Sequence, residues 1–109
     1  MTIQNFAEKL GFKPLCMPSP EREINGVYIG DLLSWVMGRA EQDNVWITIM
    51  SNINIVAVAT LTDVSAILLS ENVIPDEDAL KTAQSKGINI LSTGLSSYEA
   101  AAKIAGILS

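Results

Sequence analysis

The stretch Val45–Leu69, VWITIMSNINIVAVATLTDVSAILL, contains one charged residue, Asp63, and decides the fold of this chain. A segment with so few charges is expected inside a globular protein. Its two ends, VWITIM and VSAILL, are short apolar runs without alternation, which is typical of parallel strands covered on both faces. Between them, Ile53–Thr62 predicts a helix that Asn52 can cap. The stretch therefore predicts a strand, a helix and a second, parallel strand.

The helix predicted between these two strands has no polar face. Asn54, Thr60 and Thr62 fall at widely separated angles around it, and a helix that is apolar all round is expected to be buried all round. One side can pack on its own sheet, and a second subunit is the natural cover for the other side. We therefore predict a homodimer. The predicted interface residues are Ile55, Val58, Ala59 and Thr62.

A membrane is the alternative cover for such an apolar helix. Ser51, Asn52, Asn54 and Asp63 interrupt the apolar run, so it falls well below the roughly 18 to 20 residues that a spanning helix needs. We therefore predict no transmembrane segment. Residues 1–20 also have neither a basic start nor an apolar signal core, and we expect a cytoplasmic protein.

Length and composition narrow the classes of function. At 109 residues the chain is long enough for a single domain, which we place at residues 1–109. Its net charge of −5 argues against nucleic acid or an anionic membrane surface as a partner. Cys16 is the only cysteine and there is no histidine. The chain therefore lacks the commonest general base and the commonest metal ligands, and we predict no metal and no cofactor.

Strands and helices alternate along the rest of the chain as well, joined by loops of a few residues. This order predicts an α/β domain of three layers with a mainly parallel sheet. Pro14 places the first strand at an edge of the sheet. The further predicted elements are a helix Ile3–Leu10, a strand Phe12–Cys16, a strand Ile24–Ile29, a helix Leu32–Arg39, a helix from Asp76 to about Lys86, a strand Ile88–Leu91, and a last helix that Ser96 or Ser97 can cap, with Glu99 near its first turn and Ala100–Leu108 completing it.

Turn residues and apolar positions between Asp43 and Tyr98 form a recognisable pattern. They are Asp43, Val45–Thr48, Ala59, Leu61, Ala66–Leu69, Pro75, Ala83, Gly87–Leu91, Ser97 and Tyr98. This pattern resembles the DRTGG domain, a family that is similar to the N-terminal, non-catalytic domain of HPr kinase/phosphorylase. The segment Gly26–Ala40, GVYIGDLLSWVMGRA, looks closer still to short stand-alone members of the family. The resemblance implies a regulatory α/β domain.

The chain departs from the motif that gives this family its name. Ser51, Asn52 and Ile53 stand where the motif begins with an acidic and a basic residue, and Ser70, Glu71 and Asn72 stand where Thr, Gly and Gly would follow. Some stand-alone members carry an HPr serine kinase label, but phosphoryl transfer needs a P-loop, GxxxxGK[ST], which this sequence lacks. We therefore predict that the chain is not an enzyme.

Few side chains are candidates for catalysis. The carboxylates nearest apolar surroundings are Asp31, Asp63 and Glu71, but none has a histidine or cysteine beside it, and each is better placed as a cap or turn residue. Trp35 and Trp46 are expected in the core or an interface, because no basic patch accompanies them. No catalytic residue is predicted.

The best candidate for a binding site is the edge of the sheet where the parallel strands end. Ligands bind there in open α/β sheets. Because Lys and Arg are absent from the three loops that follow the strands, backbone N–H groups and hydroxyls would have to hold an anion there. The alternative, that these residues are ordinary caps and turns, stays open. The candidate ligand-binding residues are Thr48, Ser51, Asn52, Ser70, Asn72, Ser92 and Thr93.

Two functions follow from these observations. The first is a non-catalytic regulatory or protein-interaction module that acts as a homodimer on a partner protein. The alternative is a small-molecule sensor that binds a nucleotide or phosphate at the carboxyl ends of the strands.

Overall fold

The computed structural model describes residues 1–108, in which five strands and five helices alternate along most of the chain. In chain order they are α1 (Ile3–Leu10), β1 (Lys13–Cys16), β2 (Gly26–Ile29), α2 (Leu33–Arg39), β3 (Asn44–Thr48), α3 (Asn54–Thr62), β4 (Ala66–Leu69), α4 (Glu77–Lys86), β5 (Ile90–Ser92) and α5 (Ser97–Leu108).

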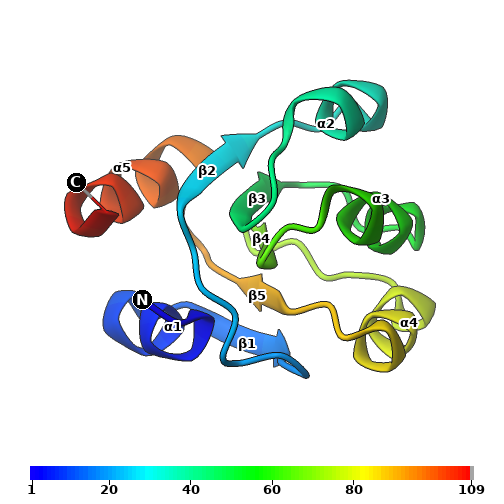
Figure 1. Cartoon of the computed structure of the whole chain (residues 1–109), viewed down its shortest axis with the longest axis horizontal. Helices are drawn as coiled ribbons and strands as arrows, with labels where there is room; N and C mark the ends of the chain where they lie inside the picture. The colour runs from blue at the N-terminus through cyan, green and yellow to red at the C-terminus, as the bar shows by residue number, and fades with distance from the viewer. Residues whose placement is uncertain (109) are drawn as a thin grey trace.

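The strands form one sheet in the order β1-β5-β4-β3-β2, between two layers of helices (Figure 1). Helices α2, α3 and α4 cover one face of the sheet, and α1 and α5 cover the other. Strands β2 to β5 run parallel, while β1 pairs with β5 antiparallel. This confirms the predicted three-layer α/β architecture with a mainly parallel sheet.

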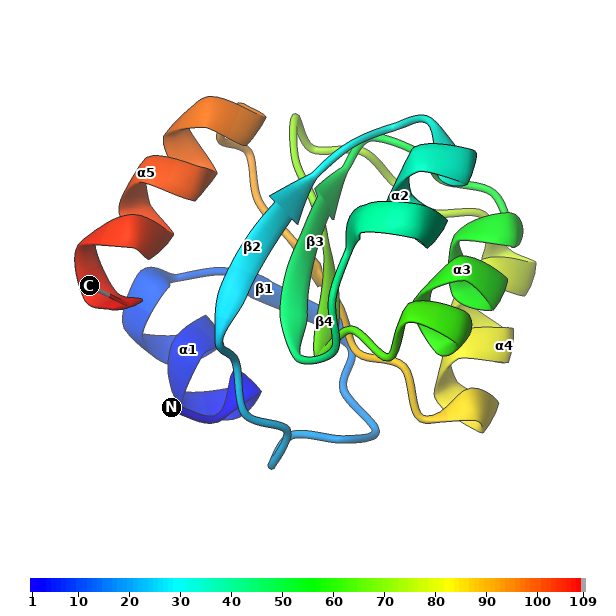
Figure 2. The same ribbon diagram turned by 45° about the horizontal axis from the view of Figure 1, so that its top comes forward.

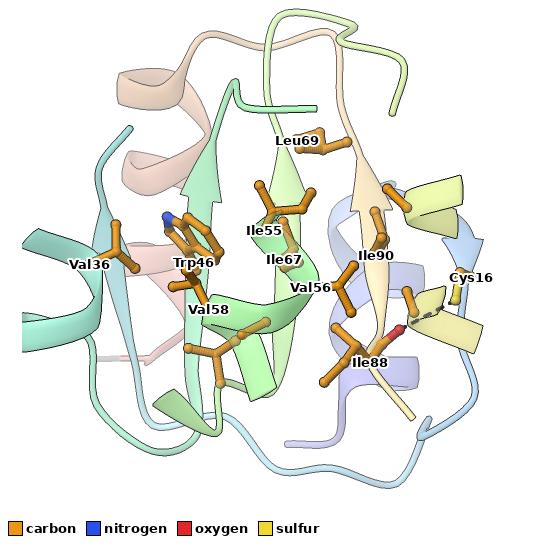
Figure 3. Close-up of a cluster of buried hydrophobic side chains, with 14 residues drawn as sticks. Cys16, Val36, Trp46, Ile55, Val56, Val58, Ile67, Leu69, Ile88 and Ile90 are labelled. Atoms are coloured by element: carbon orange, nitrogen blue, oxygen red, sulfur yellow. Dashed lines mark hydrogen bonds between the residues drawn. The ribbon is translucent and has the colours of Figure 1, made fainter. Parts of the chain in front are cut away.

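Both faces of the central strands are buried, which explains why their sequences do not alternate. In β3, Trp46 packs among the side chains beneath α2, α3 and α4, whereas Val45 and Ile47 pack beneath α1 and α5. All three side chains are fully buried. Figure 3 shows Trp46, Ile67 and Ile90 from three adjacent strands beneath α3. The sheet thus separates two hydrophobic cores, as parallel strands with helices on both faces require.

The segment between β1 and β2 runs along the amino ends of the parallel strands. Because β1 is antiparallel, it finishes at the amino-end edge of the sheet, and the chain must cross below the other strands to reach β2 (Figure 2). Arg22 anchors this crossing: Nη2 lies 2.8 Å from Asp43 Oδ1 and Nη1 lies 3.0 Å from Asp63 Oδ1. Both aspartates are turn residues with positive φ angles of 67° and 58°.

Partial burial of Arg22 by itself lowers the pKa of its guanidinium. The hydrogen bonds and charges of Asp43 and Asp63 outweigh that effect, so the pKa is raised. The carboxylate of Asp63 therefore has a structural partner at the amino-end edge, far from the ends of the strands where a ligand was predicted. Its predicted role as a cap residue agrees with its position after the last turn of α3.

The last helix begins at Ser97, and of the two predicted cap residues, Ser96 and Ser97, it is Ser96 that caps it. Ser96 Oγ accepts a hydrogen bond from Glu99 N, and Glu99 Oε1 accepts one from Ser96 N, each at 3.1 Å. This reciprocal pair is a capping box, which satisfies two N–H groups that the first turn leaves free. The bonds from Ser96 also lower the pKa of the exposed Glu99 carboxyl.

Within the single chain one side of helix α3 is buried and the other is exposed, and the structure corrects the predicted choice of interface residues. Its inner side carries Ile55, Val58 and Ala59, all at most 5% exposed within the core below α3, whereas Ala57 and Leu61 on its outer side are exposed. The predicted interface residues Ile55, Val58 and Ala59 are therefore inaccessible to a partner. The fourth, Thr62, is half-buried, and its hydroxyl donates to Val58 O at 2.8 Å.

The position of Val58 leads to a prediction about stability. In Val58→Asp a carboxylate would enter the core below α3 without a partner, and we expect a loss of roughly 4 kcal/mol or more in the free energy of unfolding. The matched variant Leu61→Asp, at a 70% exposed position of the same helix, should lose about 1 kcal/mol or less. Urea denaturation followed by circular dichroism, at a protein concentration low enough that the chain is monomeric, measures both. Equal losses would contradict this assignment of the two sides of α3.

Candidate functional site

The residues predicted to bind a ligand do lie at the carboxyl-end edge of the sheet, but most of them already have partners. At the end of β3, the Thr48 hydroxyl donates to Asp31 Oδ1 at 2.8 Å, and Ile49 N donates to the same oxygen at 3.0 Å. Thr48 is fully buried. Asp31, which lies just before α2, therefore closes the sheet edge at β3 and leaves no free hydroxyl there.

The loop before α3 is also occupied by contacts within the chain. Asn52 Oδ1 accepts a hydrogen bond from Asn54 N, the first residue of α3, at 2.9 Å, but the N-cap position itself is occupied by Ile53, one residue later than predicted. Ser51 O accepts one from Asp76 N at 2.9 Å, which ties this loop to the start of α4. These contacts favour the reading of Ser51 and Asn52 as turn residues.

The loops after β4 and β5 are joined to each other. Ser70 Oγ lies 2.8 Å from Ser97 Oγ, and Thr93 Oγ1 accepts a hydrogen bond from Leu95 N. Backbone bonds from Glu71 N to Leu95 O and from Asn72 N to Thr93 O connect the two loops, at 2.9 and 3.0 Å. These bonds hold the two loops together, and the hydroxyls of Ser70 and Thr93 are engaged in contacts within the chain.

The loop after β4 includes two residues in a backbone conformation that residues other than glycine rarely adopt. Glu71 and Asn72 have φ angles of 60° and 58°. The Asn72 amide lies against Gly94, where a β-carbon would be only 3.1 Å from Asn72 Nδ2. Glycine at position 94 thus permits this close approach. Backbone held in a strained region marks a place where the surrounding structure determines the conformation.

Two of the predicted residues, Asn72 and Ser92, do reach an open site. They line a pocket of about 450 Å³ together with Lys13. Apolar side chains form the rest of its walls: Leu15 of β1, Leu80 of α4 and, between β4 and α4, Val73, Ile74 and Pro75. Of the seven candidates, the structure therefore brings only these two together around a pocket. We call it the β1–α4 pocket.

Lys13 is the residue of this pocket that the sequence did not point to. The loops after the parallel strands hold no Lys or Arg, but β1 runs in the opposite direction, so its first residue pairs with Ser92 at the last position of β5. An antiparallel edge strand thus brings a cation to the carboxyl-end edge of the sheet. The only available signal was Pro14, which indicated an edge strand but not its direction.

The pocket lies beside the one place where the connections of the sheet diverge. The loops after β2, β3 and β4 all lead to helices on one face, whereas the loop after β5 leads to α5 on the opposite face (Figure 1). In open α/β sheets, ligands bind where successive connections leave toward opposite faces. The fold therefore places the expected ligand-binding position at the ends of β4 and β5 rather than at the end of β3.

A second hollow lies on the outer surface between α3 and α4. This α3–α4 groove has a volume of about 520 Å³ and is lined mainly by apolar groups, among them Ala57 and Leu61 of α3 and Ile53 just before it, with Lys86 of α4 at its side. Sequence reasoning missed it because it assigned the residues of α3 that face the sheet to the predicted interface, and so did not identify the outer side of the helix.

The two tryptophans have different environments. Trp46 is fully buried, and its Nε1 donates to Gly30 O at 2.8 Å, so it belongs to the core as predicted. Trp35 of α2 is 54% exposed, and the guanidinium of Arg39 lies 4.0 Å from the centre of its ring. An exposed tryptophan with a cation stacked on it is typical of an interaction surface.

Cys16 offers no reactive thiol. It is buried, and its Sγ donates to Ile88 O at 3.3 Å (Figure 3). Burial raises the pKa of this thiol and so disfavours the nucleophilic thiolate. Within residues 1–108, no three His, Cys, Asp or Glu side chains gather as a metal ion would require. The same part of the chain contains no helix with the length and apolar character needed to cross a membrane.

Comparison with known proteins identifies a family and a structural relative. The family model described as the DRTGG domain matches residues 5–107. Among solved structures, the chain is similar to the CBS and DRTGG domains of the regulatory region of Clostridium perfringens pyrophosphatase, complexed with its activator diadenosine tetraphosphate. The TM-score is 0.73 at 15% sequence identity. No curated protein matches this sequence.

Because the sequence identity is low, this likeness shows a shared fold alone. It covers 94% of this chain and 45% of the pyrophosphatase chain, so our chain spans less than half the length of that relative.

The contacts of Asp31 predict a structural effect. Asp31→Ala removes the acceptor of two hydrogen bonds, and we expect the free energy of unfolding to fall by about 1 kcal/mol, because Asp31 is exposed and water can replace part of the interaction. Asp31→Asn keeps an acceptor oxygen and should lose less. The exposed control Glu8→Ala should change stability by about 0.5 kcal/mol at most. Urea denaturation measures the free energy of unfolding of all three variants. An unchanged value for Asp31→Ala would contradict the assignment of Asp31 as the acceptor of the bonds from Thr48 and Ile49.

Proposed function

Because the chain belongs to the DRTGG domain family, we propose that it is a non-catalytic regulatory module that acts as a homodimer on a partner protein. Support comes from the structural relative, which is the regulatory region of an enzyme rather than its catalytic part. The single observation that carries the proposal is the surface of α2 and α3, where exposed apolar side chains are concentrated.

This surface, the α2–α3 face, is apolar for a protein of net charge −5. Among the exposed large apolar residues of the described chain, five come from α2, α3 and the residues just before them: Leu32, Trp35, Met37, Ile53 and Leu61. Their exposure ranges from 40% to 70%. Helix α3 carries no charged residue at all. Apolar patches of this kind mark interaction surfaces.

A second copy of the chain is the occupant that we propose for this face. In a two-fold dimer the same surface of both subunits is buried, so each copy covers the other's Trp35 and Leu61. The α3–α4 groove lies beside Leu61 and provides a recess for side chains of the other subunit. This proposal keeps α3 in the predicted interface but moves the contact to its outer side, because Ile55, Val58 and Ala59 are internal.

Catalysis has no support in the described residues. Asp31 and Asp63 are engaged by Thr48 and Arg22, the Cys16 thiol is buried, and the sequence contains neither histidine nor a P-loop. Sensing of a small molecule is the alternative function that a specific observation favours. The β1–α4 pocket supports it, and the regulatory region of the related pyrophosphatase is complexed with a nucleotide activator.

The dimer is testable with charged substitutions. Leu61→Glu should raise the dissociation constant of the dimer at least tenfold, because a carboxylate would be desolvated in the contact. Tyr98→Glu is the matched control: Tyr98 is 80% exposed on α5, in the opposite layer. Sedimentation velocity across a range of micromolar concentrations measures both variants. A wild-type protein that remains monomeric, or equal effects of the two substitutions, would contradict the proposal.

The proposal also predicts that the chain hydrolyses no ATP and transfers no phosphoryl group. Phosphoryl transfer depends on groups that cradle the phosphates and on bound Mg²⁺, and the sequence has no P-loop to supply them. The measurement is phosphate release from ATP in the presence of Mg²⁺. Turnover that scales with protein concentration and survives a second, different purification would show that the chain is an enzyme.

A further inference from the structure

The β1–α4 pocket has polar side chains that the fold does not use. Within residues 1–108, the side chains of Lys13, Asn72 and Ser92 make no hydrogen bond or ion pair, in contrast to Thr48, Asn52, Ser70 and Thr93 along the same edge. Three free polar groups from three segments thus converge on one pocket. Each brings a different chemistry: a cation, an amide and a hydroxyl.

The walls between these polar groups are apolar. Leu15 and Leu80 are half-buried and pack against the core below α4, Pro75 is buried, and Ile74 is 83% exposed at the rim. A pocket of about 450 Å³ with apolar walls and a few convergent polar groups has the size and composition of a small-molecule site. Its occupant should combine one anionic group with a flat or apolar body.

We propose that the β1–α4 pocket binds a nucleoside monophosphate, with the phosphate on Lys13 and Ser92 and the base against Ile74, Pro75 and Asn72. This inference rests on the sensing role given above as the alternative function. The Asn72 amide supplies a donor and an acceptor side by side, the arrangement with which asparagine pairs with the edge of adenine. The bonds of its loop to Thr93 and Leu95 hold Asn72 in place before the ligand arrives.

Charge restricts the ligand to a single phosphate. Lys13 is the only charged side chain among the described residues that line the pocket. Directly after Pro75, the chain continues with three acidic residues, Asp76, Glu77 and Asp78, all exposed. These negative charges follow a residue that lines the pocket, and they repel the additional charges of a polyphosphate. Lys13 can balance one phosphate, whereas further phosphates would meet this acidic turn.

The experiment compares AMP with its parts by isothermal titration calorimetry on the full chain. AMP should bind wild-type protein, and ATP, adenosine and inorganic phosphate should each bind at least tenfold more weakly. Lys13→Met should weaken AMP at least tenfold and leave adenosine unchanged. Lys9→Met, an exposed position on α1 in the opposite layer, is the matched control and should bind AMP as wild type does.

Asn72→Ala gives a second, independent readout. It removes the amide that contacts the base, so it should weaken the binding of AMP and of adenosine by a similar factor. Lys13→Met, in contrast, should weaken the binding of AMP alone. Both side chains are exposed and make no hydrogen bond or ion pair within the described chain, so Lys13→Met should leave thermal unfolding without ligand unchanged. Asn72→Ala places alanine at a φ of 58°, which asparagine tolerates better, so it should lower the unfolding temperature by a few degrees, and its binding is measured well below that temperature.

The outcomes distinguish this inference from the function on which it rests. Equal AMP binding by wild type and Lys13→Met would overturn the assignment of the phosphate. Wild-type protein that does not bind AMP, but is stabilised by another metabolite in a thermal-shift screen, would overturn the site inference and leave the sensing role standing. If no metabolite shifts the unfolding temperature at millimolar concentration, the sensing role falls together with the site.

Discussion

Burial of β3 and β4 on both faces is the constraint on which the rest of this structure depends. Every residue of these two strands is buried, from Asn44 to Thr48 and from Ala66 to Leu69. Strands of this kind need helices on each side of the sheet, because an uncovered face would leave large apolar side chains in water. The two helical layers, the parallel connections and the confinement of polar groups to the ends of the strands all follow from it.

The same constraint explains why so few polar groups are free for function. Where a buried strand ends, its backbone and the nearest side chains must still be hydrogen-bonded, since an unpaired buried polar group costs about 1 to 3 kcal/mol. Asp31 satisfies Thr48, and Ser97 satisfies Ser70. Most of the polar side chains that suggest a binding site in the sequence are thus hydrogen-bonded within the chain. Among the described residues of this edge, the free polar side chains that line a pocket are Lys13, Asn72 and Ser92, beside β1 and β5.

The surface divides into regions suited to different tasks. The α2–α3 face is apolar and nearly free of charge, which suits contact with another protein surface. The β1–α4 pocket combines apolar walls with one cation, which suits a small anion. Both lie on the same side of the sheet, because α4 borders the α3–α4 groove and the pocket alike.

Local patterns in the sequence determined the elements and the architecture. Apolar runs without alternation fixed β3 and β4 as two-sided strands, and the Ser96–Glu99 pair specified the start of α5, since these features depend only on residues a few positions apart. Only the tertiary structure decided the direction of β1, and with it the place of Lys13 beside Ser92. It also decided which side of α3 faces water. An apolar helix has no pattern to orient it, so Val58 and Leu61 are distinguished by the sheet beneath them, which is assembled from residues distant in the chain.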